Sequence, residues 1–178
     1  MTETLGPALP DDVEQLAHAV LERAAKHDIA LVTAESCTGG MLASLLTDIE
    51  GASHVFERGF VTYSKQAKCD LLGVQRSVID DCGAVSETVA IAMAEGALAR
   101  SEGALALAIT GFAGSSGGDG ETGLIHIACA VREGPLLHRE LHLGPVDRGP
   151  ARVATVRAAL ELIDEAMNGL LAADSLSE

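Results

Sequence analysis

The stretch TAESCTGG, residues 33–40, places two nucleophiles side by side between an apolar run and a pair of glycines. Ser36 carries a hydroxyl and Cys37 a thiol, and either attacks a carbonyl carbon once a neighbouring group takes its proton. The preceding residues 29–32 are typical of a buried strand, and the following residues 41–46 are typical of a helix. Backbone N–H groups at such a helix start favour an oxyanion. An ordinary capped strand-to-helix turn fits the stretch equally well.

A serine nucleophile needs a proton acceptor, and the segment RGFVTYSKQAK, residues 58–68, contains two kinds of candidate. Tyr63, the only tyrosine of the chain, ends a predicted strand, and Lys65 and Lys68 fall in the first turns of the next predicted helix. A tyrosinate or a neutral lysine accepts a proton when its surroundings lower its pKa. Taken by itself, the segment fits a surface lysine pair beside a half-buried tyrosine better than a catalytic base.

Two further segments have compositions that suit an anion. Residues 110–123, TGFAGSSGGDGETG, are rich in glycine, which indicates positive φ angles or close approach of the backbone to a ligand. A flexible hairpin loop has the same composition, and the segment matches neither a P-loop nor the GxGxxG dinucleotide pattern. Arg148 and Arg152 lie near a predicted helix start and are spaced to hold a phosphate. A solvated, salt-bridged surface is the commoner setting of such a pair.

Metal-binding patterns are missing from the sequence. His138 and His142 are four residues apart, but in a predicted strand this spacing separates the side chains more than a helix would. With no HExxH and no cluster of His, Cys and Asp, we predict no metal and no cofactor, and we interpret both histidines as surface residues. The cysteines lack CxxC spacing, and we predict four reduced, buried thiols: Cys37, Cys69, Cys82 and Cys129.

The charge balance limits the partners of the chain, whose formal net charge is −14. A nucleic-acid surface needs clustered Lys and Arg, and anionic membranes attract basic segments, so neither partner is expected. A small anionic ligand stays compatible, because a few basic groups make a local positive pocket. The sequence shows no signal peptide and no apolar run of about 18 residues, so we expect a cytoplasmic protein. Helices rich in Ala and Leu either cover a sheet or pack against a second copy of the chain. We expect a homo-oligomer.

The elements that must position these side chains alternate along the chain. Together they predict an α/β fold: a single layered domain with a mixed β-sheet flanked by helices. The domain is predicted over residues 11–172, with flexible tails at 1–10 and 173–178. Predicted strands cover residues 29–33, 56–63, 104–109, 124–131 and 136–143, and predicted helices cover residues 13–24, 38–48, 64–72, 77–82, 89–100 and 150–171.

Five segments occur in a set order: TAESCTGG, ERGFVTYSKQAK, GAVSETVAIAMAEGA, TGFAGSSGG and DRGPAR. This order resembles that of the CinA C-terminal domain family, and the resemblance covers about Val13 to Leu171. The family includes nicotinamide-nucleotide amidases, which hydrolyse the carboxamide of nicotinamide mononucleotide to give nicotinic acid mononucleotide and ammonia without a metal. Fused family members carry a larger N-terminal domain that is not found in this sequence, so the resemblance implies no pyrophosphatase activity of that kind.

The resemblance implies that Ser36 attacks the amide carbon. Tyr63, held by Lys68, then takes the Ser36 proton and passes it to the departing ammonia, and water hydrolyses the acyl-enzyme. We interpret Cys37 as a packed neighbour, since the side chain beside a nucleophile on a sharp turn normally points away. The other expected roles are orientation of the carboxamide by Glu35, oxyanion stabilisation by N–H groups of Thr38, Gly39 and Gly40, nucleotide contacts by Thr110, Gly111, Ala113 and Gly114, and phosphate binding by Arg148 or Arg152.

The glycine-rich segment departs from the family pattern, which has TGIAGP and a later KPVG. Phe112 and Ser115 replace Ile and Pro, and acidic Asp119 and Glu121 replace a basic residue of the loop. Lys65 stands where the family usually has Asn. These changes leave two alternatives to deamidation of nicotinamide mononucleotide. One is an amidase for a different amide, and the other is a nucleotide-binding or regulatory domain without turnover.

Overall fold

The computed structural model describes residues 9–114 and 120–174. Five strands form one sheet in the order β2-β1-β3-β4-β5, in which β2, β1 and β3 are parallel while β4 and β5 are antiparallel to their neighbours. This arrangement confirms the predicted α/β domain with a mixed sheet. The strands are β1 (Leu31–Glu35), β2 (Phe56–Val61), β3 (Leu105–Gly111), β4 (Leu124–Val131) and β5 (Leu136–His142).

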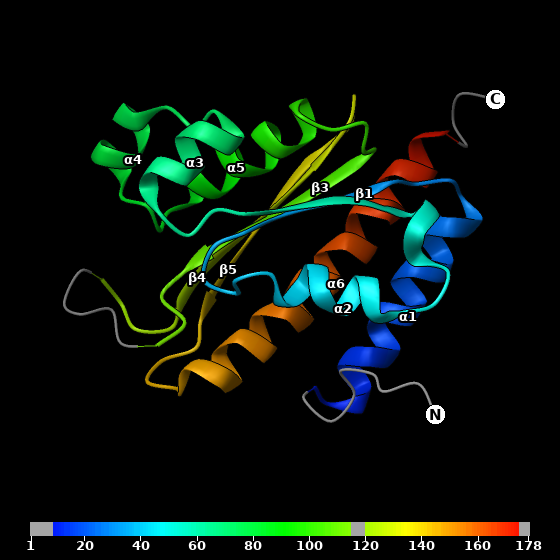
Figure 1. Cartoon of the computed structure of the whole chain (residues 1–178), viewed down its shortest axis with the longest axis horizontal. Helices are drawn as coiled ribbons and strands as arrows, with labels where there is room; N and C mark the ends of the chain where they lie inside the picture. Colours follow the sequence, from blue (N-terminus) through cyan, green and yellow to red (C-terminus); the bar gives the residue numbers. More distant parts are fainter. Residues whose placement is uncertain (1–8, 115–119, 175–178) are drawn as a thin grey trace.

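Helices cover both faces of the sheet, with α1, α2 and α6 on one face and α3, α4 and α5 on the other (Figure 1). None of the helices within the described ranges has the length and apolar character needed to cross a membrane. The helices are α1 (Asp11–Lys26), α2 (Met41–Asp48), α3 (Lys65–Leu72), α4 (Arg76–Cys82), α5 (Glu87–Ala99) and α6 (Arg148–Asp174), with a short 3₁₀ turn at Ala52–His54.

The two faces of the sheet are packed with side chains of different size. In β3, Leu105, Leu107 and Ile109 belong to the core beneath α1, α2 and α6. The alternate residues Ala106 and Ala108 face α5, as do alanines of β4. Because alanines project so little, α5 lies close against the sheet. This aliphatic packing is how the chain builds a core with only 2% aromatic residues.

Three details at the ends of elements differ from the predictions. Leu9, predicted to lie in a flexible tail, buries its side chain against the core, and residues 1–8 lie outside the described ranges. At the other end of the chain, α6 extends to Asp174, into the segment predicted as a second tail. All four cysteines are free, but Cys82 is exposed and Cys69 is only partly buried, so predicted burial was wrong for these two.

Gly96 in α5 allows α3 to approach closely. A Cβ atom at this position would lie 2.0 Å from the carbonyl oxygen of Leu72, the last residue of α3. Real Cβ atoms do not come this near to a backbone atom, so the contact requires glycine. Since α3 also carries Lys68, the α5–α3 contact helps to set the position of that lysine.

We expect Gly96→Ala to destabilise the fold by about 1–3 kcal/mol, because the added methyl group forces α3 away from α5. Gly169→Ala is the matched control, since Gly169 is also helical and an added Cβ would meet its nearest atom, Pro135 Cγ, at 3.7 Å. That substitution should instead stabilise the protein by up to about 1 kcal/mol through helix propensity. Urea unfolding measures both free energies, and equal effects of the two substitutions would contradict the proposed close contact.

Candidate active site

Three neighbouring strands end at one edge of the sheet and bring distant parts of the sequence together. In the parallel register, Glu35 at the end of β1 pairs with Val61 of β2 and with Ile109 of β3. The residues that follow these positions, including Ser36 and Thr110, therefore meet at the carboxyl ends of the strands. This is the edge at which open α/β sheets bind their ligands.

Lys68 lies directly against Ser36. Its Nζ atom is 2.9 Å from Ser36 Oγ and 2.7 Å from the carbonyl oxygen of Thr62. The lysine is 1% exposed and the serine 8%, so the contact is almost closed to water. Ser64 caps α3 by accepting the N–H of Ala67, which fixes the helix turn from which Lys68 projects.

Burial makes the Lys68 amine unusually acidic. Desolvation lowers the pKa of Lys68 from 10.5 to about 8, because the charged form is disfavoured away from water. Within the described ranges, no carboxylate forms a salt bridge with Lys68 that would restore the charged form. With this pKa about a tenth of the amine is neutral at pH 7, and the neutral form can accept a proton from the hydroxyl that it touches.

Cys37 lines the same cavity but has more apolar surroundings than Ser36. Its side chain is 5% exposed and packs within the apolar cluster beneath α1, α2 and α6. Burial raises the pKa of the Cys37 thiol to about 11, so the reactive thiolate is scarce at neutral pH. Between the two adjacent nucleophiles of the sequence, the structure gives a proton acceptor to Ser36 and an apolar environment to Cys37.

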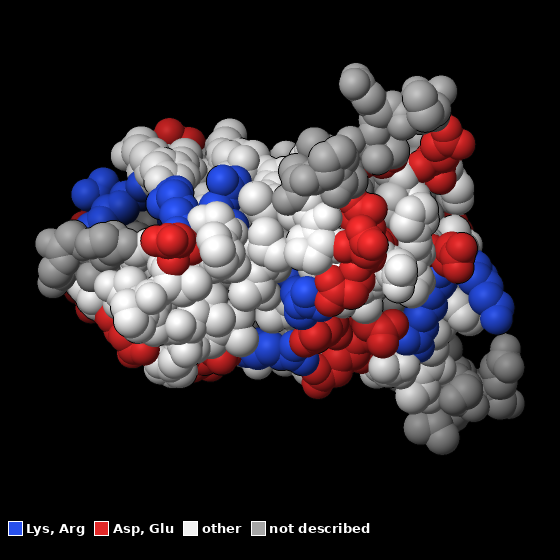
Figure 2. Space-filling view, turned by 90° about the horizontal axis from the view of Figure 1, so that it is seen from below, with Lys and Arg blue, Asp and Glu red and all other residues white. Residues whose placement is uncertain are grey.

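A cavity of about 280 Å³ opens beside Ser36 and Lys68. The residues predicted to contact a nucleotide, Thr110, Gly111, Ala113 and Gly114, all line it. The charged residues that line it are Lys65, Lys68 and Arg148, with no acidic residue among the described lining residues. Figure 2 shows Lys and Arg atoms gathered at one end of the molecule, with acidic atoms beside them. In a chain of net charge −14, this basic cavity favours an anionic ligand.

Comparisons of the sequence and of the structure with known proteins all point to the same family. The model of the CinA C-terminal domain matches residues 13–167. The chain belongs to the CinA C-terminal domain family.

Among curated relatives, a CinA-like protein of Akkermansia muciniphila is 46% identical over 152 residues, which are 84% of this chain and 36% of the relative. A putative competence-damage inducible protein of Symbiobacterium thermophilum is 49% identical over 123 residues, or 68% of this chain and 29% of the relative. The chain thus spans about a third of the length of these relatives.

Solved structures of similar proteins agree closely with this CinA C-terminal domain. A competence/damage inducible protein of Agrobacterium tumefaciens has a TM-score of 0.85 and 42% identity, covering 93% of this chain and 99% of its own. A CinA superfamily protein of Escherichia coli has a TM-score of 0.80 and 33% identity, covering 90% of this chain and 96% of its own. The predicted family resemblance is confirmed.

In this CinA C-terminal domain, Glu35 is a structural carboxylate, which corrects its expected contact with a substrate amide. The side chain is fully buried and accepts the backbone N–H groups of Gly40, Leu42 and Ala43 at 2.8–3.2 Å. A carboxylate at a helix N-terminus is stabilised by these N–H groups and by the helix dipole. Sequence reasoning missed this cap because the carboxylate lies five to eight residues before the groups that it binds.

The expected oxyanion donors need a related correction. The Gly39 N–H donates to the carbonyl of Ser36 at 3.0 Å, and the Gly40 N–H donates to Glu35. Both groups are therefore occupied by the turn itself. The backbone N–H groups of Cys37 and Thr38 have no hydrogen-bond acceptor within the part of the chain that the structure describes. They are the free donors nearest to Ser36.

Tyr63 also differs from its expected position in the proton path. Its hydroxyl accepts a hydrogen bond from Arg148 at 3.0 Å, and the residue is 65% exposed. The described structure shows no hydrogen bond from Tyr63 to Lys68 or Ser36, because Lys68 already occupies the position beside the serine. Arg152, a predicted phosphate ligand, does not line the cavity and instead binds the carbonyl of Thr38.

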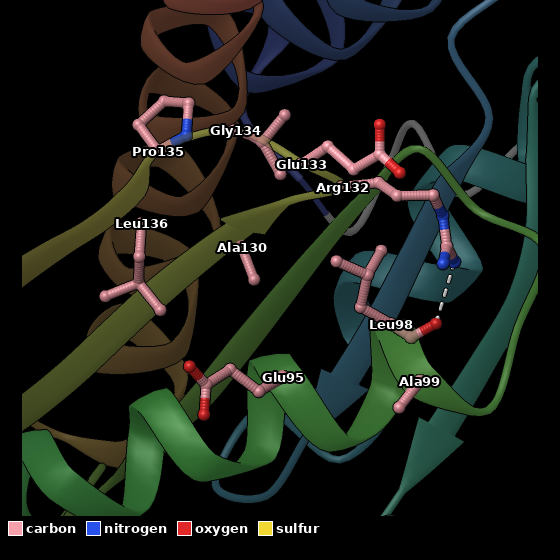
Figure 3. A pocket seen from close by; sticks show the side chains of 10 residues that line it. Glu95, Leu98, Ala99, Ala130, Arg132, Glu133, Gly134, Pro135 and Leu136 are labelled. Atoms are coloured by element: carbon pink, nitrogen blue, oxygen red, sulfur yellow. Dashed lines mark hydrogen bonds between the residues drawn. The ribbon is translucent and has the colours of Figure 1, made fainter.

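A second cavity, of about 530 Å³, lies at the opposite end of the sheet, between α5 and the turn that joins β4 to β5 (Figure 3). Arg132, one of its lining residues, donates hydrogen bonds to the carbonyl groups of Leu98, Ser101 and Gly103. The arginine thereby satisfies carbonyls at and beyond the end of α5. Since Val131 at this end of β4 pairs with Leu105 at the start of β3, the cavity is remote from Ser36.

Histidines of β4 and β5 form a cluster that the sequence did not indicate. His126 Nδ1 lies 3.1 Å from His138 Nε2, and His126 is 6% exposed, so His138 is not the free surface residue expected. His142 is exposed and binds Glu121 and Glu140, and the hydrogen bond to Glu121 raises the pKa of His142. No group of three or more His, Cys, Asp or Glu side chains suited to a metal ion occurs among residues 9–114 and 120–174.

The lowered pKa of Lys68 predicts a pH-dependent stability term. Unfolded Lys68 keeps its proton up to about pH 10.5, whereas folded Lys68 loses it near pH 8. Between these values the unfolded chain binds more protons, so this term makes the free energy of unfolding rise with pH. We expect the free-energy difference between wild type and Lys68→Met to grow in favour of wild type across this window. Urea unfolding at several pH values measures it, and parallel curves would show that the pKa is normal.

Proposed function

We propose that this chain is a metal-independent serine amidohydrolase that deamidates nicotinamide mononucleotide to nicotinic acid mononucleotide and ammonia. The contact between Lys68 Nζ and Ser36 Oγ at 2.9 Å, in a site that lowers the lysine pKa to about 8, carries the proposal. It pairs a nucleophile with a base that needs no third group to accept the proton. The basic cavity beside it supports an anionic substrate, and the family resemblance supports a pyridine nucleotide.

The chemical steps follow from this pair. Neutral Lys68 takes the proton of Ser36 Oγ while the oxygen forms a bond to the carboxamide carbon. Lys68 then gives the proton to the departing nitrogen as the carbon–nitrogen bond breaks, which releases ammonia and leaves an ester on Ser36. A water molecule, deprotonated by the same amine, attacks the ester and restores the serine hydroxyl. Tyr63 is outside this proton path and, with Arg148, borders the entrance for the substrate.

The tetrahedral intermediate requires hydrogen-bond donors for its oxyanion. The N–H groups of Cys37 and Thr38 are unpaired in the described structure and belong to the turn that carries Ser36. They replace Gly39 and Gly40 in this role, since those two N–H groups are already bound. Such donors are typically worth about 10²–10³ in rate.

The changed glycine-rich segment is compatible with a phosphate-bearing substrate. The Glu121 carboxylate binds His142 at 2.9 Å, and Glu121 does not line the cavity. Lys65, which stands in place of the usual Asn, does line it and lies 3.7 Å from Asp80 at the surface. Ser115 and Asp119 lie outside the described residues. Lys65 therefore adds a basic side chain to the lining of the cavity.

We expect Ser36→Ala to lower kcat/KM for nicotinamide mononucleotide by at least about 10³-fold, because no nucleophile remains beside Lys68. Lys68→Met should lower it by about 10²–10⁴-fold through loss of the general base. Cys37→Ser should retain most of the activity, since the buried thiol has no part in the proton transfer. Ammonia release measures all three. Full activity of Ser36→Ala together with inactive Cys37→Ser would assign the nucleophile to the thiol.

Arg148→Gln tests whether Arg148 binds the phosphate of the substrate. We expect the KM for nicotinamide mononucleotide to rise about 10–100-fold, the usual value of one lost charge-assisted hydrogen bond. The KM for nicotinamide riboside, which lacks the phosphate, should change much less. Arg23→Gln is the control, because Arg23 pairs with Asp164 and does not line the cavity. An equal rise of KM for both substrates would show that Arg148 does not bind the phosphate.

A further inference from the structure

The turn that carries Ser36 has little intrinsic rigidity. Gly39 and Gly40 are consecutive and both have positive φ angles, +62° and +91°. Glycine has the largest backbone freedom of any residue, so two in succession lose the most conformational entropy when the turn is ordered. A nucleophile that must stay within hydrogen-bond distance of Lys68 needs this turn to be held by other contacts.

Arg152 of α6 supplies one such contact from a distant part of the sequence. Its Nη2 atom donates a hydrogen bond to the carbonyl oxygen of Thr38, and a Cβ atom at Gly39 would lie 3.4 Å from the same nitrogen. Thr38 is fully buried, so this carbonyl has no access to bulk water. The Nε atom of Arg152 is buried and has no hydrogen-bond partner in the described structure. Arg152 is only partly buried, but an unpaired buried nitrogen is costly and calls for an explanation.

The two ends of a single peptide unit connect Arg152 to the nucleophile. The Thr38 carbonyl and the Gly39 N–H belong to the same planar peptide group, so fixing one fixes the other. Arg152 and, at 3.3 Å, the Met41 N–H both donate to the Thr38 carbonyl. The Gly39 N–H donates to the carbonyl of Ser36 itself at 3.0 Å. The guanidinium therefore acts on Ser36 through one rigid plane.

The other arginine of this helix shows the contrast. Arg148 lies one helical turn before Arg152, lines the cavity and binds the Tyr63 hydroxyl. Arg152 does not line the cavity, although the spacing in the sequence suggested equal roles for the pair. The start of α6 thus holds the nucleophile turn with one arginine and presents the other to the cavity.

We propose that Arg152 is a positioning residue for Ser36 and not a ligand of the substrate phosphate. The proposal rests on the amidohydrolase function proposed above. It assigns to Arg152 the alignment of the Thr38–Gly39 peptide, and through it the placement of Ser36 Oγ and of the neighbouring N–H groups. A planar guanidinium suits this role, because its donors keep a fixed direction that a lysine ammonium does not.

The test compares Arg152→Gln and Arg152→Lys with Arg157→Gln, a control on the same helix whose arginine is exposed and pairs with Asp12. Three properties are measured on the whole chain. The first is kcat and KM for nicotinamide mononucleotide and for nicotinamide riboside. The second is the rate at which a fluorophosphonate probe labels Ser36, followed by mass spectrometry. The third is the urea unfolding curve.

We expect Arg152→Gln to lower kcat about 10–100-fold for both substrates with little change of KM, since small misplacements of a nucleophile have effects of this size. Labelling of Ser36 should slow in parallel, Arg152→Lys should fall between, and Arg157→Gln should match wild type. A rise of KM confined to the phosphorylated substrate would overturn the proposal. A loss of kcat that equals the unfolded fraction of the variant would also overturn the proposal.

A failure of the proposed function gives a different result. If wild type hydrolyses neither amide but Ser36 is still labelled, the substrate assignment fails while the labelling rates decide the role of Arg152. Slower labelling of Arg152→Gln than of Arg157→Gln then supports positioning, and equal rates overturn it. If the probe does not label wild-type Ser36, the serine is not an activated nucleophile and both proposals fail.

Discussion

The candidate site depends on one buried amine. Lys68 projects from α3 onto Ser36, and its side chain is almost completely removed from bulk water. The same burial that costs folding free energy lowers the pKa of Lys68 and so enlarges the neutral fraction that the proposed mechanism uses as a base. The features around it serve this placement: the Ser64 cap orients the helix, Gly96 lets it approach α5, and the Thr62 carbonyl accepts a hydrogen bond from the lysine amine. The two polar contacts that fix the amine are to a hydroxyl and a carbonyl oxygen. Neither is a carboxylate that would stabilise the charged form of the lysine.

Near the site, the buried carboxylate and the cations of the cavity occupy different places. Glu35, the buried carboxylate, is satisfied by backbone N–H groups of α2 and makes no salt bridge with Lys68 in the described structure. A salt bridge there would hold the lysine in its charged form and remove the base. The cations that line the cavity, Lys65 and Arg148, lie on the outer side, where they attract an anion. The cavity of this acidic protein is thus basic because the residues that line it within the described structure include cations and no carboxylate.

Local patterns in the sequence predicted the elements, and three-dimensional register decided the contacts. The apolar run before Ser36 and the alternation of strands with helices were sufficient for the mixed sheet, because burial is periodic along each element. The family resemblance, and not a local pattern, gave Thr110 and Gly114 as substrate contacts, and both line the cavity beside Ser36. Sequence reasoning could not show that Lys68 is buried, since a lysine in a first helical turn is usually exposed. It also gave Glu35 the wrong partner, because a cap five residues away depends on the shape of the turn.

The helix that closes the fold also completes the site, and its first residue explains how. The predicted start at Pro150 would have left Arg148 in a loop, but α6 begins at Arg148 itself. In a helix, residues four apart share a face, so Arg148 and Arg152 both point toward the strand ends. One contacts Tyr63 after β2 and the other contacts Thr38 after β1. Two loops that share no secondary structure are thus joined by a single rigid element. The geometry around Ser36 is therefore complete only when the C-terminal helix has docked.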